Sequence, residues 1–328
     1  MIVTKTPLRM SFVGGGSDME AYYKENEGAV ISTSIDKYMY ITLSKKFSGD
    51  IRLSYSKTEQ VNNVNEILHP LVRESLSLLN INGGIEITST ADIPSQGSGL
   101  GSSSSYTVGL LNALHALQKK TISKMDLAEM ACHIEINKCE EPIGKQDQYA
   151  AAIGGLNLIQ FKNDGSVVVE KVQCSDKTRN IFEESILIFY TGRTRKASDL
   201  LSKQRDNLGN KTKRLMMDNM VKMAYEMKSH LENNHIDSIG NLLHENWLLK
   251  KQITMGVSDK KIDEWYLRGI NAGALGGKLM GAGHGGFLMF MADPKNHRNI
   301  IKSLSDLKHV PFSFDQSGSC IVYNDQNE

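Results

Sequence analysis

The stretch DIPSQGSGLGSSSSYTVGLLNAL, residues 92–114, decides how this sequence is interpreted. Glycine and serine fill its middle, and leucines at helical spacing follow directly. A flexible linker has a similar composition, but a linker joins finished domains, whereas this stretch joins a strand-like segment to an amphipathic helix. A helix start that follows glycines presents unpaired backbone N–H groups to an anion. The stretch therefore predicts a loop that holds a phosphate group.

Two common phosphate-loop patterns do not fit this stretch. The pattern G-x-x-x-x-G-K-[ST] fails because no lysine follows Gly101, and G-x-G-x-x-G fails because Ser102 stands at the position of its third glycine. The prediction therefore depends on the context of the loop, which is a strand, a glycine-rich turn and a helix start in that order.

The composition limits the class of protein. With 328 residues, of which 40% are hydrophobic, the chain can fill a sizeable core in one large domain or two packed domains. A formal net charge of +1 gives no general attraction to nucleic acid or to an anionic membrane, and we expect neither as a partner. No apolar run approaches the roughly 18 residues of a membrane span, and the first residues do not resemble a signal peptide. The scattered cysteines, without a C-x-x-C pair, are typical of a reduced, cytoplasmic protein.

Strand-like and helix-like segments alternate along the chain. Strand-like segments lie at Ala29–Lys45, Gly83–Ile93 and Ser185–Gly192, and two more, HGGFLMFMAD and GSCIVYND, come near the end on either side of a short helix. The second half is typical of long helices, with methionines along one helical face as in core packing. We therefore expect an α+β chain with an N-terminal lobe at 1–190 and a C-terminal lobe at 191–328.

Two further glycine clusters stand near the ends of the chain, TPLRMSFVGGGSD at 6–18 and GGKLMGAGHGGFLMF at 276–290. Each alone is compatible with an ordinary turn. Together with the serine-rich loop they resemble the signature motifs of the GHMP kinases, a family named for galactokinase, homoserine kinase, mevalonate kinase and phosphomevalonate kinase. The most specific element is PSQGSGLGSSSS at 94–105, which resembles the family's P-x-x-x-G-L-G-S-S loop.

Within this family, TPLRMSFVGGGSD, PIGKQDQYAAAIGG and KLMGAGHGGF resemble the branch of bacterial sugar kinases that act on D-glycero-D-manno-heptose 7-phosphate. Galactokinases carry G-E-H-T-D in place of GGGSD. The resemblance implies a two-lobed fold, with an N-terminal lobe like ribosomal protein S5 domain 2 and a ferredoxin-like C-terminal lobe. It also implies an ATP- and Mg²⁺-dependent kinase, which phosphorylates the anomeric (C1) hydroxyl to the 1,7-bisphosphate for nucleotide-activated heptose and surface polysaccharide synthesis. Its partners would be the sugar phosphate and ATP, and it would be a monomer or homodimer.

The resemblance also implies roles for single residues. Asp147 would take the proton of the acceptor hydroxyl, with Arg9 beside it to hold it ionised. Ser103 and Glu135 would share the Mg²⁺ ion, which takes hydroxyl and carboxylate oxygens. ATP binding would fall to Pro94, Gly97, Ser98, Gly99, Leu100, Gly101, Ser102, Ser103 and Ser104. Three glycines of the last motif, Gly281, Gly283 and Gly285, would press on the phosphate loop from the second lobe.

The acceptor would be bound by residues from several motifs. Asp18 resembles the galactokinase aspartate that binds sugar hydroxyls. Arg195 and Lys145 would bind the distal phosphate, because arginine favours bidentate contact with phosphate. A solvated basic turn is an equally good interpretation of the cations near Arg195. The full set is Arg9, Gly15, Gly16, Ser17, Asp18, Lys145, Asp147 and Arg195.

Three alternatives stay open. The chain could be another sugar kinase of the same family, acting on galactose or fucose. It could be a sensor that binds nucleotide and sugar without catalysis, although the presence of Arg9, Asp147, Glu135 and Ser103 disfavours this. It could also belong to the decarboxylase branch of the family, which the GKQDQY context disfavours.

Overall fold

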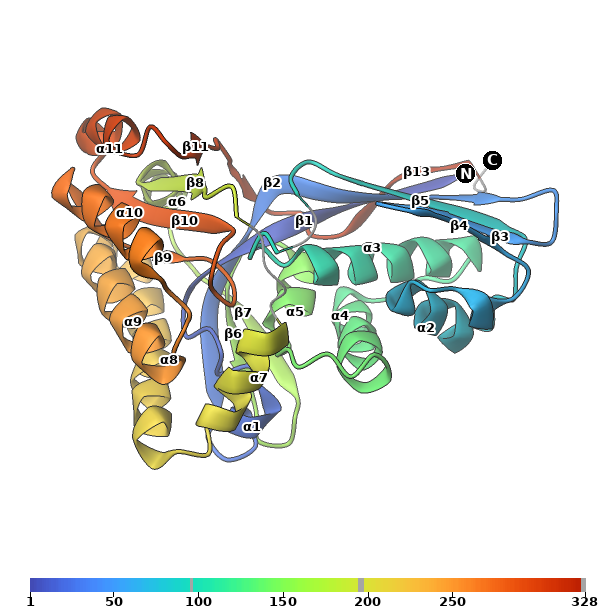
Figure 1. Ribbon diagram of the computed structural model, residues 1–328, viewed down its shortest axis with the longest axis horizontal. Coiled ribbons are helices and arrows are strands. Elements are labelled where there is room, and N and C mark those ends of the chain that lie inside the picture. The colour runs from blue at the N-terminus through green and yellow to red at the C-terminus, as the bar shows by residue number, and fades with distance from the viewer. Residues whose placement is uncertain (95–96, 194–197, 326–328) are drawn as a thin grey trace.

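The computed structural model describes residues 1–94, 97–193 and 198–325, which form two sheets with helices packed on them (Figure 1). The larger sheet has the strand order β13-β1-β2-β5-β3-β4, with β12 and β6 paired to β2, and β7 paired to β6. Ile2 pairs with Asn324, so the first and last strands lie side by side at one edge. The strands are β1 (Ile2–Val13), β2 (Gly28–Lys45), β3 (Ile51–Ser54), β4 (Thr58–Val61), β5 (Ile85–Ala91), β6 (Leu156–Phe161), β7 (Val167–Lys171), β12 (Phe314–Asp315) and β13 (Cys320–Asn324).

Helices cover one face of this sheet beside β1. Helix α3 lies against β1 and β2, with α2, α4 and α5 around it. Most of α3 is buried, which its alanines, leucines and Gly109 allow. This packing places the start of α3, and with it the serine-rich loop, next to the middle of β1. The helices are α1 (Glu20–Tyr23), α2 (Pro70–Leu78), α3 (Ser102–Leu117), α4 (Lys124–Cys132) and α5 (Gln146–Ile153), with a 3₁₀ turn η1 (Val64–Glu66) and a π-helical segment η2 (His133–Lys138) that continues α4.

The smaller sheet has the order β11-β8-β10-β9, with antiparallel neighbours. Counted along the chain, this order is 4-1-3-2, which is the arrangement of a ferredoxin-like lobe. Its strands are β8 (Ile186–Tyr190), β9 (Ala274–Leu279), β10 (Phe287–Ala292) and β11 (Lys308–His309). The remaining elements are α6 (Asp176–Glu184), α7 (Ser198–Asn207), α8 (Lys211–Glu232), η3 (Ile236–Ser238), α9 (Ile239–Ile253), α10 (Lys260–Asn271), η4 (Pro294–Asn296) and α11 (His297–Ser303).

The division of the chain between the two sheets differs from the predicted division at residue 190. Strand β8, which ends at Tyr190, pairs with β10 and β11 and so lies in the smaller sheet. Strands β12 and β13, near the end of the chain, return to the larger sheet and pair with β2 and β1. The sequence does not reveal this exchange because an apolar strand pattern indicates burial and not the identity of the partner strand.

One cluster of buried side chains joins the two lobes. It combines residues of β1 with the methionine face of α8 and with residues of the smaller sheet, and it includes Leu8, Met10, Phe12, Met220, Met223, Met227, Met280, Phe287 and Met289. The prediction that the methionine face packs in the core is confirmed. Each fully buried apolar side chain contributes about 1.5–3 kcal/mol, so this shared core holds β1 firmly against the second lobe.

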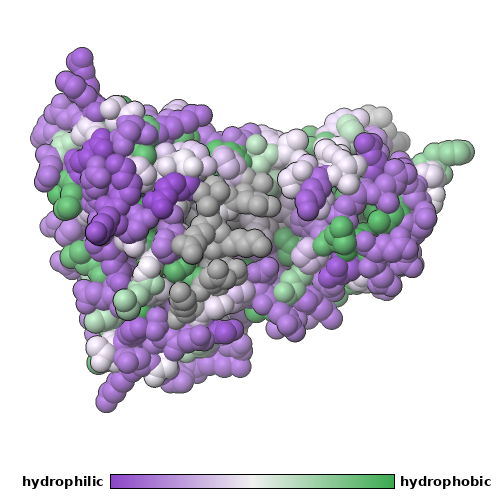
Figure 2. Space-filling view, in the orientation of Figure 1, coloured by the Kyte–Doolittle hydropathy of each residue, from purple (hydrophilic) through white to green (hydrophobic). Residues whose placement is uncertain are grey.

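The surface shown in Figure 2 is mostly hydrophilic, and its apolar side chains lie in small, scattered patches. Among the helices of the described residues, none is both long and apolar enough to cross a membrane.

Candidate active site

Arg9 and Asp147 form a two-bonded ion pair where the sheet, α5 and the phosphate loop meet. Arg9 Nε lies 2.7 Å from Asp147 Oδ1, and Arg9 Nη2 lies 2.8 Å from Asp147 Oδ2. Arg9 Nη1 also donates to the carbonyl oxygen of Gly99 at 2.7 Å. The Arg9 side chain is 6% exposed, and that of Asp147 is 23% exposed. The predicted contact between these two residues is therefore present, and Arg9 ties it to the loop.

The phosphate loop ends at Gly101, directly before the first turn of α3. Arg9 N donates to the carbonyl oxygen of Leu100 at 3.0 Å, and the Leu100 side chain is fully buried beneath the loop. The hydroxyls of Ser98 and Ser102 lie 2.8 Å apart and brace the turn. The predicted ATP-binding residues 97–104 thus form the turn before a long helix and its first residues, where backbone N–H groups and the helix dipole favour an anion.

The third glycine motif contacts this loop from the second lobe. Gly99 has a φ of +76°, and a Cβ there would lie 2.4 Å from the carbonyl oxygen of Met280. A Cβ on Gly281 would lie 2.5 Å from the Cα of Gly99. Only glycine allows this approach of two backbones. The predicted pressure of Gly281 on the loop is therefore present.

Two of the predicted support glycines contact other segments. A Cβ on Gly283 would meet the carbonyl oxygen of Val257, and one on Gly285 would meet that of Arg193. Gly286, the last glycine of the motif, does lie against the loop, since a Cβ there would lie 2.3 Å from the carbonyl oxygen of Ser98. The motif turns sharply, so neighbouring glycines face different segments.

Glu135 is a fully buried carboxylate at the base of the phosphate loop. It accepts hydrogen bonds from the hydroxyls of Ser103 at 3.1 Å, Ser104 at 2.7 Å and Thr107 at 2.9 Å. Gln148, which sequence reasoning missed, donates a further hydrogen bond through its amide. Burial raises the pKa of Glu135 to about 7, against the effect of these donors.

This arrangement fits a divalent cation. The donors around Glu135 are neutral, and Ser103 is exposed and bonded to the carboxylate, so a cation beside Ser103 would supply the missing positive charge. The hydroxyl and carboxylate oxygens are hard ligands of the kind that Mg²⁺ takes. Within the described residues no group of three or more His, Cys, Asp or Glu side chains is placed to hold a metal, so the ion's other ligands would come from nucleotide and water.

Asp18 lies beside the Arg9–Asp147 pair and is joined to it through Gln146. Its carboxylate accepts from the backbone N–H of Gly16 at 3.0 Å and from the side-chain amide of Gln146 at 3.0 Å. Only 2% of Asp18 is exposed, and its pKa is raised by burial and then by the charge of Asp147. Since α5 begins at Gln146, the start of this helix joins Asp18 to Asp147.

Two of the predicted substrate-binding residues, Ser17 and Lys145, form hydrogen bonds with other parts of the fold. The Ser17 hydroxyl is fully buried and bonds the backbone of Ala29, donating at 3.2 Å and accepting at 3.1 Å, so it braces the turn. Lys145 Nζ donates to the carbonyl oxygen of Gly165 at 2.6 Å and lies 5.0 Å from the centre of the Tyr23 ring, so its charge points away from Asp147. Arg195 lies outside the described residues. Gly15 and Gly16 lie in the turn beside Asp18.

Two lysines of the second lobe also reach this region, and the sequence analysis did not include them. Lys278, on β9, donates to the carbonyl oxygens of Ser11 at 2.8 Å and Phe12 at 3.1 Å. Lys250, on α9, is 6% exposed, and a Cβ on Gly15 would lie 3.9 Å from its Nζ. Burial lowers the pKa of both lysines, that of Lys250 to about 8. A lysine on the buried face of an amphipathic helix is the signal that could have revealed Lys250.

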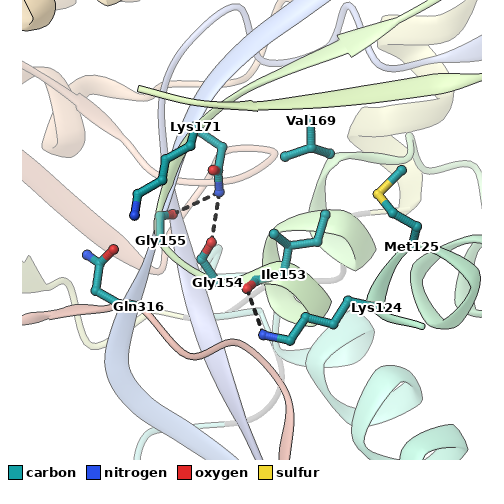
Figure 3. A pocket seen from close by; sticks show the side chains of 9 residues that line it. Lys124, Met125, Ile153, Gly154, Gly155, Val169, Lys171 and Gln316 are labelled. Atoms are coloured by element: carbon teal, nitrogen blue, oxygen red, sulfur yellow. Dashed lines mark hydrogen bonds between the residues drawn. The ribbon is translucent and has the colours of Figure 1, made fainter. Parts of the chain in front are cut away.

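Two cavities differ in their relation to this site. One, of about 290 Å³, is bordered by Pro94 at the start of the phosphate loop and by Tyr190 and Phe287 of the second lobe. The other, of about 340 Å³, lies between α4, the end of α5 and β7 (Figure 3). It is lined by Lys124, Ile153 and Lys171 among others, and it includes none of the predicted site residues. The second cavity is therefore separate from the Arg9–Asp147 pair.

The sequence was compared with protein-family models. Residues 62–155 match the N-terminal domain of the GHMP kinases, and residues 227–307 match the C-terminal domain of the same family. The chain belongs to the GHMP kinase family. As a member of it, the protein is an ATP-dependent phosphotransferase with an alcohol group as acceptor.

Individual relatives match over nearly the whole chain. A D-glycero-alpha-D-manno-heptose 7-phosphate kinase of Campylobacter jejuni is 30% identical, with 97% of each chain covered. A galactokinase of Pyrococcus furiosus is 23% identical, with 91% of each covered. Among solved structures, a D-glycero-D-manno-heptose 1-phosphate kinase from Bacteroides thetaiotaomicron superimposes with a TM-score of 0.81 at 23% identity, covering 99% of this chain and 100% of the other. The predicted two-lobed GHMP kinase fold is confirmed.

Proposed function

We propose that this protein transfers the γ-phosphoryl group of ATP to the anomeric C1 hydroxyl of D-glycero-D-manno-heptose 7-phosphate. The acceptor oxygen forms a bond to the γ-phosphorus while the bond between that phosphorus and the β,γ-bridging oxygen breaks. The products are the heptose 1,7-bisphosphate and ADP. The hydroxyl proton passes to the carboxylate of Asp147.

The observation that carries this proposal is the Arg9–Asp147 ion pair beside the phosphate loop. A carboxylate next to a loop that holds a triphosphate can orient a hydroxyl and accept its proton as phosphoryl transfer proceeds. Arg9 holds that carboxylate with two bonds and bonds Gly99 as well, so acceptor and donor are positioned by one side chain. The 30% identity to a heptose 7-phosphate kinase over 97% of the chain supports the choice of acceptor.

The surrounding residues take complementary roles. The backbone N–H groups at the start of α3 bind the phosphates of ATP, and Asp18 accepts hydrogen bonds from sugar hydroxyls. Ser103 and Glu135 would hold Mg²⁺, which neutralises charge on the phosphates when bound. The cavity bordered by Pro94 and Phe287 lies at the start of the loop, where a nucleotide can enter between the lobes.

A substrate panel tests the proposal. ADP release is measured with heptose 7-phosphate, heptose 1-phosphate, unphosphorylated D-glycero-D-manno-heptose, galactose and fucose. Heptose 1-phosphate is included because the names of two relatives differ in the position of the phosphate on the acceptor. Asp147→Asn protein, prepared in the same way, controls for contaminating kinases. Phosphorus NMR of the product then shows which hydroxyl has been esterified.

We expect the highest kcat/KM with heptose 7-phosphate and a new anomeric phosphate ester. Equal or better turnover of an unphosphorylated sugar would contradict the heptose phosphate assignment and leave a general sugar kinase. Preference for heptose 1-phosphate would contradict attack by the C1 hydroxyl. Binding of sugar and ATP without any ADP release would favour the sensor interpretation.

A further inference from the structure

Helix α9 carries a stripe of buried polar residues on the face that meets the first glycine turn. Asn246 and Lys250 are four residues apart, so they share one helical face, and they are 0% and 6% exposed. Thr254, which directly follows the helix, is 1% exposed. Asn246 Oδ1 accepts from the backbone N–H of Gly14 at 3.2 Å, which fixes the stripe against the turn. A helix that only packed would place apolar side chains at these positions.

Several polar atoms of this region have no hydrogen-bond partner among the residues that the structure describes. Asn246 Nδ2 and Thr254 Oγ1 are buried without a hydrogen bond, as are Ser11 Oγ on β1 and Gln146 Oε1 on α5. No hydrogen bond or ion pair reaches Lys250 Nζ from the part of the chain that the structure describes. A buried polar group without a partner costs free energy, and several together indicate a place where a polar ligand supplies the partners.

Two of these atoms, together with the Gln146 amide, lie around one position beside Gly15. A Cβ built there would lie 3.5 Å from Ser11 Oγ, 3.9 Å from Lys250 Nζ and 4.0 Å from Gln146 Nε2. Gln146 is the residue whose amide bonds Asp18. The Ser11 hydroxyl of the larger sheet and the Lys250 ammonium of the second lobe therefore lie on the side of the site where Gln146 bonds Asp18.

The comparison with Lys278 shows that burial alone does not explain Lys250. Lys278 is 2% exposed, and its ammonium is used on two carbonyl oxygens of β1, Ser11 and Phe12, so it ties the second lobe to the larger sheet. Lys250 has a similar burial and comes from the same lobe, yet its ammonium is left without a partner. The Lys278 ammonium is therefore bonded within the fold, whereas the Lys250 ammonium is available to bind a ligand.

On the basis of the kinase function proposed above, we propose that Lys250 binds the acceptor sugar by donating hydrogen bonds from its ammonium group to hydroxyl oxygens. A sugar hydroxyl both donates and accepts, while an ionised carboxylate only accepts and an ammonium group only donates. Asp18 and Lys250 on the same side of the site therefore match the two halves of a polyol's hydrogen bonding. Lys250 is a residue for acceptor affinity, and the phosphoryl group is left to Arg9 and the loop.

The test compares Lys250→Met with Lys251→Met. Methionine keeps the length of the side chain and removes the charge. Lys251, the next residue, is 29% exposed and pairs with Asp263 on another face of α9, so it is a matched control outside the site. We expect Lys250→Met to raise the KM for the acceptor about 10- to 100-fold, since a hydrogen bond from a charged group is lost, and to change the KM for ATP less than about twofold. Lys251→Met should leave both values unchanged.

A pH profile separates binding by the charge from a structural role. The charged groups that face Lys250 are Asp18 and Asp147, which favour its protonation, and Arg9 and Lys278, which oppose it. With burial these place the pKa of Lys250 at about 8, so the ammonium is lost as the pH rises from 7 to 9. The acceptor KM of the wild type should rise across this range. Lys250→Arg, which stays charged, should lack this rise, and so should Lys250→Met.

Thermal unfolding supplies the second readout. A buried charge without a partner disfavours folding, so Lys250→Met should unfold at the wild-type temperature or above it, whereas loss of a structural lysine would lower that temperature. An unchanged acceptor KM in Lys250→Met would overturn the proposal. A fall in kcat with unchanged KM for every acceptor would also overturn it, because it would place Lys250 on the transferring phosphoryl group.

The outcome is distinguishable from failure of the proposed function. The variants are measured with whichever sugar the wild type phosphorylates best, so a preference for galactose would refute the heptose assignment and still test Lys250. If no sugar is phosphorylated, calorimetric titration of the same sugars compares their Kd for wild type and Lys250→Met. An equal Kd for a sugar that binds the wild type, or no binding of any sugar to the wild type, would then overturn the role of Lys250.

Discussion

Replacing Asp147 with asparagine isolates the charge of the site's central carboxylate. Asparagine keeps the shape and one acceptor oxygen, but it has no negative charge and cannot take a proton from the acceptor. The Asp147 carboxylate binds Arg9 through both oxygens, at 2.7 and 2.8 Å, so the substitution loses one of these bonds. Arg9 keeps its bond to the carbonyl oxygen of Gly99 at 2.7 Å, which holds the guanidinium in place.

Two effects of different size follow from Asp147→Asn. Loss of one partner of a fully buried ion pair costs about 3–5 kcal/mol of folding free energy. The Asp147 side chain is 23% exposed and one bond is kept, so we expect about 1–2 kcal/mol here. The catalytic effect is larger, because kcat should fall about 10²- to 10⁴-fold, which corresponds to about 2.7–5.4 kcal/mol in the activation barrier.

Steady-state ADP release at saturating ATP and acceptor gives kcat, and calorimetric titration of ATP without acceptor gives the Kd for the nucleotide. We expect that Kd to stay within a few-fold of wild type. Asp176→Asn is the matched control, since the Asp176 side chain is 88% exposed and bonds only Arg179 among the described residues. Its kcat should equal that of the wild type. Turnover close to wild type in pure Asp147→Asn, folded as judged by thermal unfolding, would refute the role of Asp147 as the base.

Further predictions concern the metal, the loop and the distal phosphate. Ser103→Ala and Glu135→Gln should each raise the Mg²⁺ concentration needed for half-maximal rate, and the double variant should lose less than the product of the single losses because the two share one ion; a full product would contradict this. Gly99→Ala should lower the unfolding temperature and raise the KM for ATP, since its Cβ would meet Met280 at 2.4 Å, whereas Gly49→Ala, with nothing within 4 Å, should do neither. Arg195→Ala should raise the KM for the phosphorylated acceptor about 10- to 100-fold and leave the KM for ATP unchanged. An unchanged KM for the phosphorylated acceptor would favour the alternative interpretation, in which Arg195 belongs to a solvated basic turn.

The sequence predicts the parts of the fold that depend on local pattern. The alternating segment Ala29–Lys45 is the long strand β2, and the serine-rich loop leads into α3 as its glycines and leucines indicate. The contact between Arg9 and Asp147, far apart in the chain, followed from the resemblance of their motifs and not from any physical feature of either residue. Motif resemblance therefore supplied long-range contacts that periodicity cannot.

The remaining features depend on tertiary packing. Ser17 and Asp18 are neighbours in one motif, but the Ser17 hydroxyl bonds Ala29 whereas the Asp18 carboxylate bonds Gln146. Neighbours in a motif therefore need not share one site. In the segment HENWLLKKQIT, helical spacing places Lys250 on the same face as Trp247 and Ile253, which indicates that Lys250 is buried. Only the packing of α9 beside β1 shows which groups its ammonium meets.

The site contains buried polar groups whose hydrogen-bonding capacity the fold leaves partly unused. Their burial lowers the stability of the folded chain, and other contacts must offset this loss. The Asp18 carboxylate and the Lys250 ammonium are desolvated by burial, and the Ser11 hydroxyl is buried without a partner, so each lowers the stability of the folded chain. The apolar cluster shared by β1, α8 and the smaller sheet offsets this cost and fixes the lobes together. Because the groups are desolvated and oriented on folding, the acceptor meets them already in place, and its binding energy need not be used to reorganise them. Ser11, Gln146 and Lys250 accordingly lie on a strand and two helices at the boundary of the lobes, where the core holds them.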